Sequence, residues 1–384
     1  MKKFFYYSFS MLLLSGILVG INACSKKTEG VPTPPPPTGM LQNAQKGTPF
    51  STGSVNDFVL AEKDKQVVLM AANNTTGMVY AIDLEDNDAS LATTNAITNP
   101  VNNFGTQLAL TLGVPAGDVS VLNMEVNPVS KSIYLLVSTW ASNTTSIVKV
   151  TNQGTTFNVL DLSNVSYVAI PFSTLGENVN DMTWGDNSVY LSYSHPSTLV
   201  GKIASAQAPF EQNEVMVNRA TTVFKTNWGE MFHTNAPLES MCYAEVAGEK
   251  RLLGVTVCAP GFSFKTSDIT DGSGLLEVNE YFNLNTGSAR KVYPVVQNNK
   301  TYLIEHHMTG RIVRVGEKYI DGSQTQFNAD ATYLLQMNGS RTAGLNDEDV
   351  RIIHAGGVYF ISVLYTDSQL LGISSSGALS LIAL

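Results

Sequence analysis

The segment VNDFVL at residues 55–60, a polar turn and VVLM at 67–70 recur as VNDMTW at 179–184, a polar turn and VYLS at 189–192. Each copy consists of an apolar strand, a turn of charged residues, glycine or asparagine, and a second apolar strand. This succession is the pattern of a β-hairpin. The repeat therefore predicts a fold assembled from copies of one antiparallel unit.

Weaker copies of the hairpin continue along the 384-residue chain. Their paired strands span residues 124–126 and 133–136, 243–246 and 252–257, 295–296 and 301–304, and 351–353 and 358–361. Third strands follow several hairpins, at 78–82, 147–150, 311–315 and 370–373, and fourth apolar runs close some units, at 157–160 and 379–382.

The spacing of these units decides between β architectures. Four antiparallel strands that recur about every 50–65 residues, with no amphipathic helix between them, are typical of a β-propeller. We therefore predict an all-β fold, a β-propeller of six four-stranded blades, over residues 55–384. A seventh blade between Asp83 and Val119 stays open. A β-sandwich, or two smaller β domains, is the alternative fold.

The first residues have the pattern of a secretory signal. Lys2 and Lys3 precede an apolar run that serines and glycines interrupt, and the run ends just before Cys24. A charged start, a short apolar run and a small residue before the cleavage point are typical of a signal peptide. A membrane-spanning helix would need about 20 mainly apolar residues. Residues 1–23 are therefore predicted to be a removed signal peptide, and a retained membrane anchor is the alternative.

Residues Ile21–Cys24 resemble a bacterial lipobox, from which Asn22 departs. The resemblance implies that the Cys24 thiol receives a diacylglyceryl group and holds the protein at the lipid bilayer. Residues 24–54 contain the proline run Pro34–Pro37 and are predicted to form the lipidated, semi-rigid tether. Lipobox, tether and β domain together resemble the envelope lipoproteins of Bacteroidota. That resemblance implies an outer-membrane location, on either the periplasmic or the surface side.

Charge and composition exclude one class of partner. The formal net charge is −9, only 14% of the residues are charged, and the Lys26-Lys27 pair is the longest basic run after the signal peptide. A nucleic-acid-binding surface needs clustered lysine and arginine side chains. We therefore expect no nucleic-acid partner.

Cys242 and Cys258 are the candidate disulfide of the exported, oxidising compartment. They flank a hairpin whose turn lies near Gly248 or Lys250. A turn centred on Lys250 places the two cysteines opposite each other, whereas a turn nearer Gly248 offsets them. Because a bridge needs Cα atoms within about 7 Å, the register decides the outcome. Two buried thiols are the alternative.

The predicted ligand-binding face of the propeller lies where the second strand of each unit ends. Aligning the units on Tyr134, Tyr190, Leu253, Tyr302 and Tyr359 places these residues at equivalent second-strand ends: Asn73, Thr139, His195, Cys258, His307 and Leu364. The large side chains that follow them, and that would give this rim apolar walls, are Trp140, Met308 and Tyr365. The functional hypothesis is a ligand-binding mouth with His195 and His307 as hydrogen-bonding or metal-coordinating groups. Solvent-facing loop histidines are the simpler alternative.

The histidines do not predict a metal site. Zinc needs three or four convergent ligands, and the sequence spaces none of its residues in that way. Strand alternation sends His306 and His307 to opposite faces, so both cannot enter one site. The acidic run at 83–88 lacks the glycine of a calcium loop and is more typical of a solvated turn. No motif identifies a cofactor.

Asp57, Asp181 and Glu239 begin predicted innermost strands. In a propeller these positions line the central channel, where a carboxylate can contact a hydroxyl-rich ligand or cap a loop. The chain has no nucleophile elbow, phosphate-binding glycine loop or supported Ser/His/Asp arrangement.

Two functions therefore compete. The first is a non-catalytic binding or protein-interaction module of the envelope that captures a nutrient, siderophore or glycan, or docks an outer-membrane protein. Residues 311–315, 327–328 and 333–335 resemble a segment of Bacteroidota propeller lipoproteins, some of which capture ferric siderophores. The second is an envelope polysaccharide lyase or hydrolase. It requires Asp181, Glu239, His195 and His307 to meet in one pocket.

Overall fold

The computed structural model describes residues 39–50, 55–140, 144–172, 177–198, 200–226, 232–234, 236–257, 261–269, 275–278, 289–321, 350–354 and 359–384. The chain divides into two compact units, Met1–Thr38 and Gly39–Leu384, and the described residues all belong to the second. In these ranges, no helix has the length and apolar character needed to cross a membrane.

The first two sheets interlock along the chain. Blade 1 contains β3 (Asp57–Lys63), β4 (Gln66–Asn73) and β5 (Met78–Asp83), followed outward by β10 (Val165–Pro171) and the short β2 (Gln45–Gly47). Blade 2 contains β6 (Val119–Val126), β7 (Ile133–Thr139), β8 (Thr144–Thr151) and β9 (Thr156–Val159). The outer strand of blade 1 therefore comes from after blade 2.

Blade 3 is the widest sheet. It contains β11 (Asn178–Gly185), β12 (Ser188–Ser194), β13 (Gly201–Gln207), β15 (Val217–Thr226) and β16 (Phe232–Thr234), with β20 (Leu275–Val278) parallel to β15. Outside the blades, β1 (Leu41–Gln42) pairs with β14 (Phe210–Glu211).

Three further sheets complete the set. Blade 4 contains β17 (Leu238–Val246), β18 (Glu249–Thr256) and β19 (Gly261–Lys265). Blade 5 contains β21 (Ala289–Gln297), β22 (Lys300–His307), β23 (Ile312–Val315) and β24 (Val350–His354). Blade 6 contains β25 (Tyr359–Thr366), β26 (Gln369–Ser374) and β27 (Leu379–Ala383).

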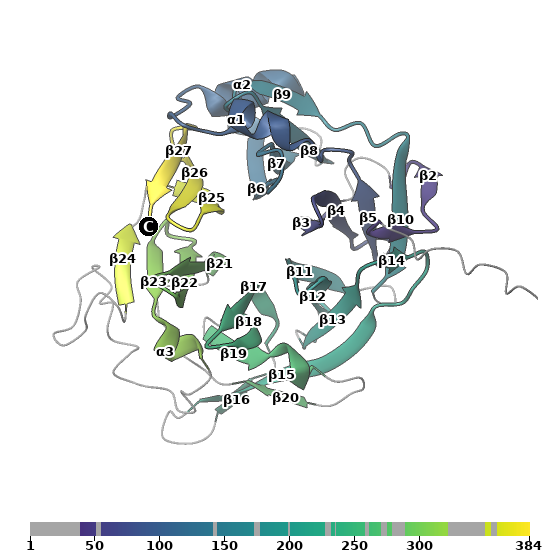
Figure 1. The fold of residues 1–384 in the computed structure, drawn as a ribbon, viewed down its shortest axis with the longest axis vertical. Helices are drawn as coiled ribbons and strands as arrows, with labels where there is room; N and C mark the ends of the chain where they lie inside the picture. The colour runs from purple at the N-terminus through teal and green to yellow at the C-terminus, as the bar shows by residue number, and fades with distance from the viewer. Residues whose placement is uncertain are drawn as a thin grey trace, which may run out of the picture. The chain divides into compact units, whose positions relative to one another are not determined.

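The blades stand in a ring with their first strands toward the centre, as Figure 1 shows. The chain is a β-propeller, and its described part contains six sheets of three or more strands. Contacts between innermost strands give the order β6, β3, β11, β17, β21, β25 and back to β6. Blade 1 thus lies between blades 2 and 3, so the order around the ring differs from the order along the chain.

Tight turns explain why the hairpins form where the sequence predicts them. Both central residues of three turns have positive φ: Asp64-Lys65, Asp186-Asn187 and Asn298-Asn299. Two-residue turns of this kind match the twist of paired strands, and asparagine and aspartate tolerate the left-handed conformation better than most residues.

The core lies between blades. Buried apolar side chains form five clusters, among them one between blades 1 and 2, one between blades 3 and 4, and one between blades 4 and 5. Each sheet therefore buries both faces, which explains the nearly continuous apolar runs of β4 and β7.

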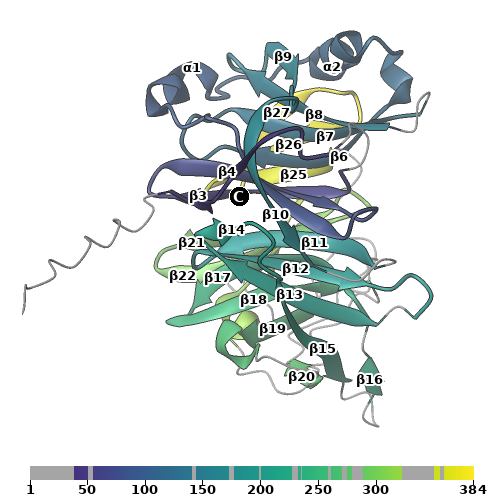
Figure 2. The same ribbon diagram turned by 90° about the vertical axis from the view of Figure 1, so that its right-hand side faces the viewer.

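The stretch between β5 and β6 does not form a seventh blade. It contains η1 (Ala89–Leu91), α1 (Ala92–Asn95), α2 (Phe104–Leu112) and η2 (Ala116–Asp118). Figure 2 shows α1 and α2 together with β9 at one edge of the ring. Two short helical elements, η3 (Thr266–Asp268) and α3 (Glu317–Ile320), occur elsewhere.

Two boundaries differ from the prediction. Strands β1 and β2 lie inside the stretch 24–54, so the described fold begins at Gly39 and not at Val55. Burial explains the difference, because Met40 is only 2% exposed. The predicted hairpin 351–361 is wrong, since β24 ends blade 5 and β25 begins blade 6. Within the described residues, the sheets of the ring contain between three and six strands.

Candidate functional site

A β-bulge near the start of five innermost strands shapes the channel. The register of these strands shifts between Val121/Asn123, Val179/Asp181, Leu238/Ser240, Ala289/Lys291 and Tyr359/Ile361. A bulge bends its strand and changes the direction of the side chains beside it. The polar residues directly after the bulges are Asn123, Asp181, Ser240 and Lys291, and Asp57 begins β3, the strand without a bulge.

Several of these polar side chains join neighbouring blades. Asp181 Oδ2 accepts a hydrogen bond from the Met241 backbone N–H over 2.7 Å, and Ser240 Oγ accepts one from the Val292 N–H over 3.1 Å. Asn123 Nδ2 donates to Asp57 Oδ1 over 2.6 Å. The bulged positions thus supply partners for backbone groups that strand pairing leaves free.

Lys291 reaches from blade 5 to blade 3. Its Nζ lies 2.8 Å from Asp181 Oδ1, and the two side chains are 14% and 3% exposed. Blade 4 lies between these two blades in the ring, so this ion pair spans the channel. Both oxygens of Asp181 are therefore engaged, one by Lys291 and one by the Met241 N–H.

A cavity of about 200 Å³ lies beside this ion pair. Its lining includes side chains from all six innermost strands, one example from each being Leu60, Glu125, Trp184, Tyr243, Lys291 and Leu364. Glu125 and Lys291 are its charged groups. In the described part of the chain, the Glu125 carboxyl makes no hydrogen bond or ion pair. The six innermost strands therefore surround a cavity whose wall contains a carboxyl group without a partner among the described residues.

Burial controls the ionisation of these acids. It raises the pKa of Asp57 to about 7, with a further rise from Asp181 and an opposing effect from Lys291. Burial also raises the pKa of Glu125 to about 8, and Lys291 again opposes the rise. The pKa of Lys291 itself is raised: burial opposes the charge, but Asp181, Asp57 and Glu125 outweigh burial. The ammonium group is therefore permanent, whereas two of the acids hold protons near neutral pH.

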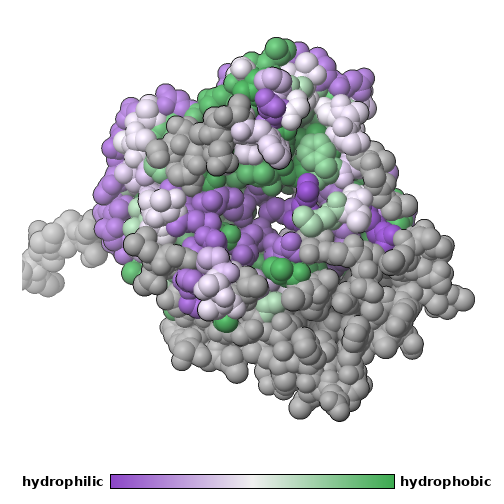
Figure 3. Space-filling model, turned by 180° about the vertical axis from the view of Figure 1, so that it is seen from behind, coloured by the Kyte–Doolittle hydropathy of each residue, from purple (hydrophilic) through white to green (hydrophobic). Residues whose placement is uncertain are grey.

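The surface view agrees with a polar channel. Figure 3 shows hydrophilic residues gathered around an opening at the middle of the ring. The cavity wall combines two charged side chains, Glu125 and Lys291, with apolar ones such as Leu60 and Leu364.

The predicted channel residues have different positions. Asp57 and Asp181 lie at the starts of innermost strands, as predicted, and take part in the charge cluster beside the cavity. Glu239 lies inside the bulge of β17 and is absent from the cavity lining. Glu125, Lys291 and Asn123 were not recognised as site residues from the sequence.

The two predicted rim histidines do not form one site. His195 follows β12, and its Nδ1 lies 2.7 Å from Ser197 Oγ and accepts the Ser197 N–H over 3.2 Å. His307 is 3% exposed, with Nε2 at 3.1 Å from Glu305 Oε2. Neither histidine lines the channel cavity. Across the described ranges, no group of three or more His, Cys, Asp or Glu side chains could hold a metal ion.

His306 points away from His307, as strand alternation predicts. Its Nδ1 lies 2.8 Å from Ser362 Oγ, and its Nε2 lies 3.2 Å from the Tyr359 carbonyl. Burial lowers its pKa to about 4, so the ring is neutral at physiological pH. It therefore joins blades 5 and 6.

The predicted apolar rim is only partly correct. Trp140 follows the end of β7, is 78% exposed and has its Nε1 3.4 Å from Ser120 Oγ. Met308 follows the end of β22 and is 59% exposed. The placement of Tyr365 and Leu364 on this rim is wrong, because β25 is an innermost strand and both residues lie near its far end. Leu364 lines the cavity instead.

The candidate disulfide involves one residue outside the described ranges, Cys258. Cys242 is a free, buried cysteine of the cavity wall, and burial raises its pKa well above the usual value. Ala247 and Gly248 form the turn, and Cys242 pairs with Leu253. This turn gives the offset register of the two alternatives. The bridge itself stays a prediction.

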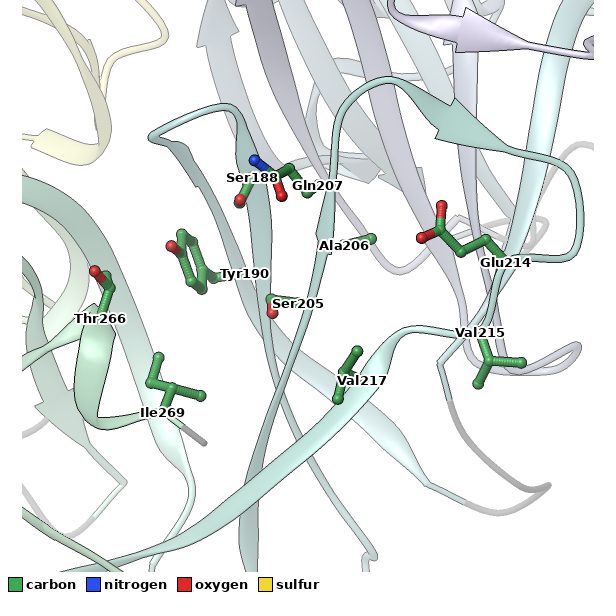
Figure 4. Close-up of a pocket in the computed structure, with 10 residues that line it drawn as sticks. All are labelled: Ser188, Tyr190, Ser205, Ala206, Gln207, Glu214, Val215, Val217, Thr266 and Ile269. Carbon is green, nitrogen blue, oxygen red and sulfur yellow. The ribbon is translucent and has the colours of Figure 1, made fainter. Parts of the chain in front are cut away.

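A second cavity, of about 320 Å³, lies at the edge of blades 3 and 4 and is shown in Figure 4. Tyr190 and Ser205 lie on one side of it and Thr266 on another, while Glu214 stands at its far end (Figure 4). Glu214 is its one charged lining residue, and its walls include no innermost strand. The channel cavity is smaller but concentrates the buried charge.

Comparisons with known proteins show little. No family model matches the chain, and no curated protein matches it. A solved structure described as the Dos1 propeller matches with 9% identity over 85% of this chain, at a TM-score of 0.32. The chain spans 66% of that structure's length. A structure of BBS1N in complex with ARL6DN matches with 12% identity over 87% of this chain and 79% of that one, at a TM-score of 0.30.

The class of protein therefore follows from the fold and the cavity. The chain is a β-propeller whose innermost strands surround a cavity. The buried charge cluster and the cavity beside it are its candidate ligand site.

Proposed function

We propose that this protein is a lipid-anchored binding module of the cell envelope that captures a small ligand in its central channel. One observation carries the proposal. All six innermost strands contribute to one cavity, and the Glu125 carboxyl in its wall has no protein partner in the described part of the chain. A polar group without a partner at such a point is costly unless a ligand or water satisfies it.

The cavity limits the size of the ligand. Pockets for drug-sized molecules usually measure about 300–1,000 Å³, and this cavity measures about 200 Å³. A compact metabolite fits inside it, whereas a glycan or metal chelate would extend beyond it. Residues 327–335, which carry most of the resemblance to siderophore-capturing proteins, lie outside the described ranges.

Retained ligand is the direct test of the binding function. We expect native mass spectrometry of protein purified in mild detergent to show an adduct of small mass. Glu125→Gln should lose the adduct, and Glu214→Gln, a substitution at an exposed site of the peripheral cavity, should keep it. An adduct that survives Glu125→Gln unchanged would place the ligand elsewhere and contradict the proposal.

The lipid anchor has its own test. Cys24→Ser removes the thiol that would carry the diacylglyceryl group, so the protein should leave the membrane fraction. Ser25→Ala preserves the cysteine and should stay with the membrane. Equal membrane recovery of both variants would refute the lipoprotein proposal.

The enzyme alternative requires Asp181, Glu239, His195 and His307 in one pocket. Only Asp181 belongs to the charge cluster beside the channel cavity, and none of the four lines that cavity. General acid–base catalysis needs both groups within reach of one substrate atom. We therefore propose a binding function for the channel.

A further inference from the structure

Resting on the proposed function, we infer that the channel cavity binds a small organic cation, a primary ammonium on a compact apolar body. Glu125 and Lys291 line the cavity, Asp57 and Asp181 lie in the charge cluster beside it, and the acids outnumber the cation. Asp57, Glu125 and Asp181 supply carboxyls from three blades, and Lys291 supplies the one cation that interacts with them. The cluster therefore has room for a second positive charge.

Lys291 is already engaged. Its Nζ binds Asp181 Oδ1 at 2.8 Å, and no hydrogen bond joins it to Glu125 or Asp57. Asp181 has both oxygens occupied. The internal ion pair thus neutralises one carboxyl and leaves two.

The remaining two carboxyls keep oxygens without a donor among the described residues. Asn123 occupies Asp57 Oδ1, while Asp57 Oδ2 is buried without a hydrogen-bond partner among the described residues, and the Asp57 side chain is 9% exposed. Glu125 lines the cavity with its carboxyl unused. An ammonium group has three N–H donors and no acceptor, so it complements this site.

Protons balance the charge of these two buried carboxyls. Burial raises the pKa of Asp57 to about 7 and that of Glu125 to about 8. A bound ammonium group would favour the ionised carboxylates and displace the protons. The other titratable groups facing Glu125 are Asp181, Lys291 and Tyr293, and blade 6 contributes only the apolar Val363 and Leu364 to the lining.

The walls favour an organic cation over a metal ion. Trp184, Tyr243 and Tyr293 line the cavity, and aromatic faces attract ammonium groups. Met182 and Met241 add flexible apolar surface. A metal ion would need several converging oxygen ligands, and the described side chains form no such group.

The experiment compares three probes of one shape in isothermal titration calorimetry at pH 8. Benzylammonium is the cation, benzyl alcohol the neutral control and benzoate the anionic control. We expect saturable binding of benzylammonium alone. Glu125→Gln should weaken it at least tenfold, and Glu214→Gln should leave it unchanged. Gln matches the protonated Glu125 in charge and shape, so this variant should keep the wild-type melting temperature, which is measured alongside.

The pH dependence supplies a second readout. Because binding releases protons from Glu125 and Asp57, the affinity for benzylammonium should rise between pH 6 and 8, by up to about tenfold per pH unit for each proton released. In Glu125→Gln the rise should be smaller. A structural role for Glu125 would leave this profile unchanged.

Three outcomes would contradict the cation inference, and they differ in what they imply for the channel. Equal or tighter binding of benzyl alcohol or benzoate, still weakened by Glu125→Gln, would overturn the cation inference and leave the channel function in place. Calcium chloride that binds in competition with benzylammonium would assign the site to a metal ion. If none of the probes binds, the cation inference is overturned, and the retained-ligand experiment decides the proposed function.

Discussion

Buried acids couple the stability of this propeller to pH. Burial raises the pKa of Asp57 to about 7 and that of Glu125 to about 8, whereas both titrate near 4 in an unfolded chain. Between these values the folded state holds protons that the unfolded chain has released. The free energy of unfolding therefore decreases as pH rises toward 8.

The window from pH 6.5 to 8 isolates this effect. Below pH 6.5, His306 makes the free energy of unfolding rise with pH. Burial lowers its pKa to about 4 in the folded protein, whereas in the unfolded chain the ring takes up a proton near pH 6.5. We predict that the free energy of unfolding falls by about 1–2 kcal/mol across the window. Glu125→Gln should remove more than half of this decrease. Urea denaturation at several pH values measures it, and a flat or rising profile in the wild type would contradict the burial of these acids.

Part of the candidate site could be predicted from the sequence. Asp57 and Asp181 were predicted in the channel because each begins a recognisable copy of the hairpin. Glu125 and Lys291 were missed for a physical reason: a bulge redirects side chains, and a bulge adds a single residue that hydrophobic alternation does not show. The pair Arg290-Lys291, directly before the apolar run that begins at Val292, was the signal that could have suggested Lys291.

Among the elements, β10 is the least expected. It completes blade 1 beside β5 although it follows blade 2 along the chain. Its register pairs Ser166 with Asp83, and both side chains are half-buried. Hairpin patterns describe only adjacent strands, so this distant pairing could not be predicted from them.

A double cysteine variant tests this pairing. Directly opposed residues of antiparallel strands have Cα atoms close enough for a disulfide. Asp83→Cys with Ser166→Cys should therefore form an intramolecular bridge, seen by intact mass without reductant. Asp83→Cys with Asn158→Cys should not, because Asn158 pairs with Lys149 in blade 2. If the variant at positions 83 and 158 formed the bridge and the variant at 83 and 166 kept free thiols, β9 and not β10 would lie beside β5.

The misassigned hairpin at 351–361 shows how turn residues can mislead. Gly356 and Gly357 follow one apolar run and precede another, as in a two-residue hairpin turn. The strands on either side pair elsewhere, β24 with β23 and β25 with β26. Local sequence does not distinguish a turn within a blade from a connection between blades. The prediction of a second strand at 358–361 therefore placed Tyr365 and Leu364 on the wrong rim.

At the scale of the whole molecule, the helical insertion closes the ring. Val101 and Leu379 exchange backbone hydrogen bonds of 2.8 and 3.1 Å, which joins the insertion to the outer strand of blade 6. The Ile97 N–H donates to the Tyr365 hydroxyl over 2.8 Å. Composition and repeats predicted the propeller, but equivalent blades do not encode their order around the ring.

Removing one contact tests this closure. Tyr365→Phe leaves the buried Ile97 N–H without an acceptor, so the free energy of unfolding should fall by about 1–3 kcal/mol. Tyr167→Phe loses an exposed bond to Gln45 and should cost less than about 0.5 kcal/mol. Urea denaturation compares the two. Equal effects would show that the insertion does not hold the ring.

The position of a bound cation in a crystal decides whether the channel is the ligand site. Crystals of the wild-type protein soaked in 4-bromobenzylammonium would reveal the bromine by its anomalous scattering. We expect one site in the channel, with the ammonium group against Glu125 and the ring beside Trp184 or Tyr243, and no such site in Glu125→Gln crystals. Bromine in the peripheral cavity beside Tyr190 and Thr266, with an empty channel, would contradict this expectation.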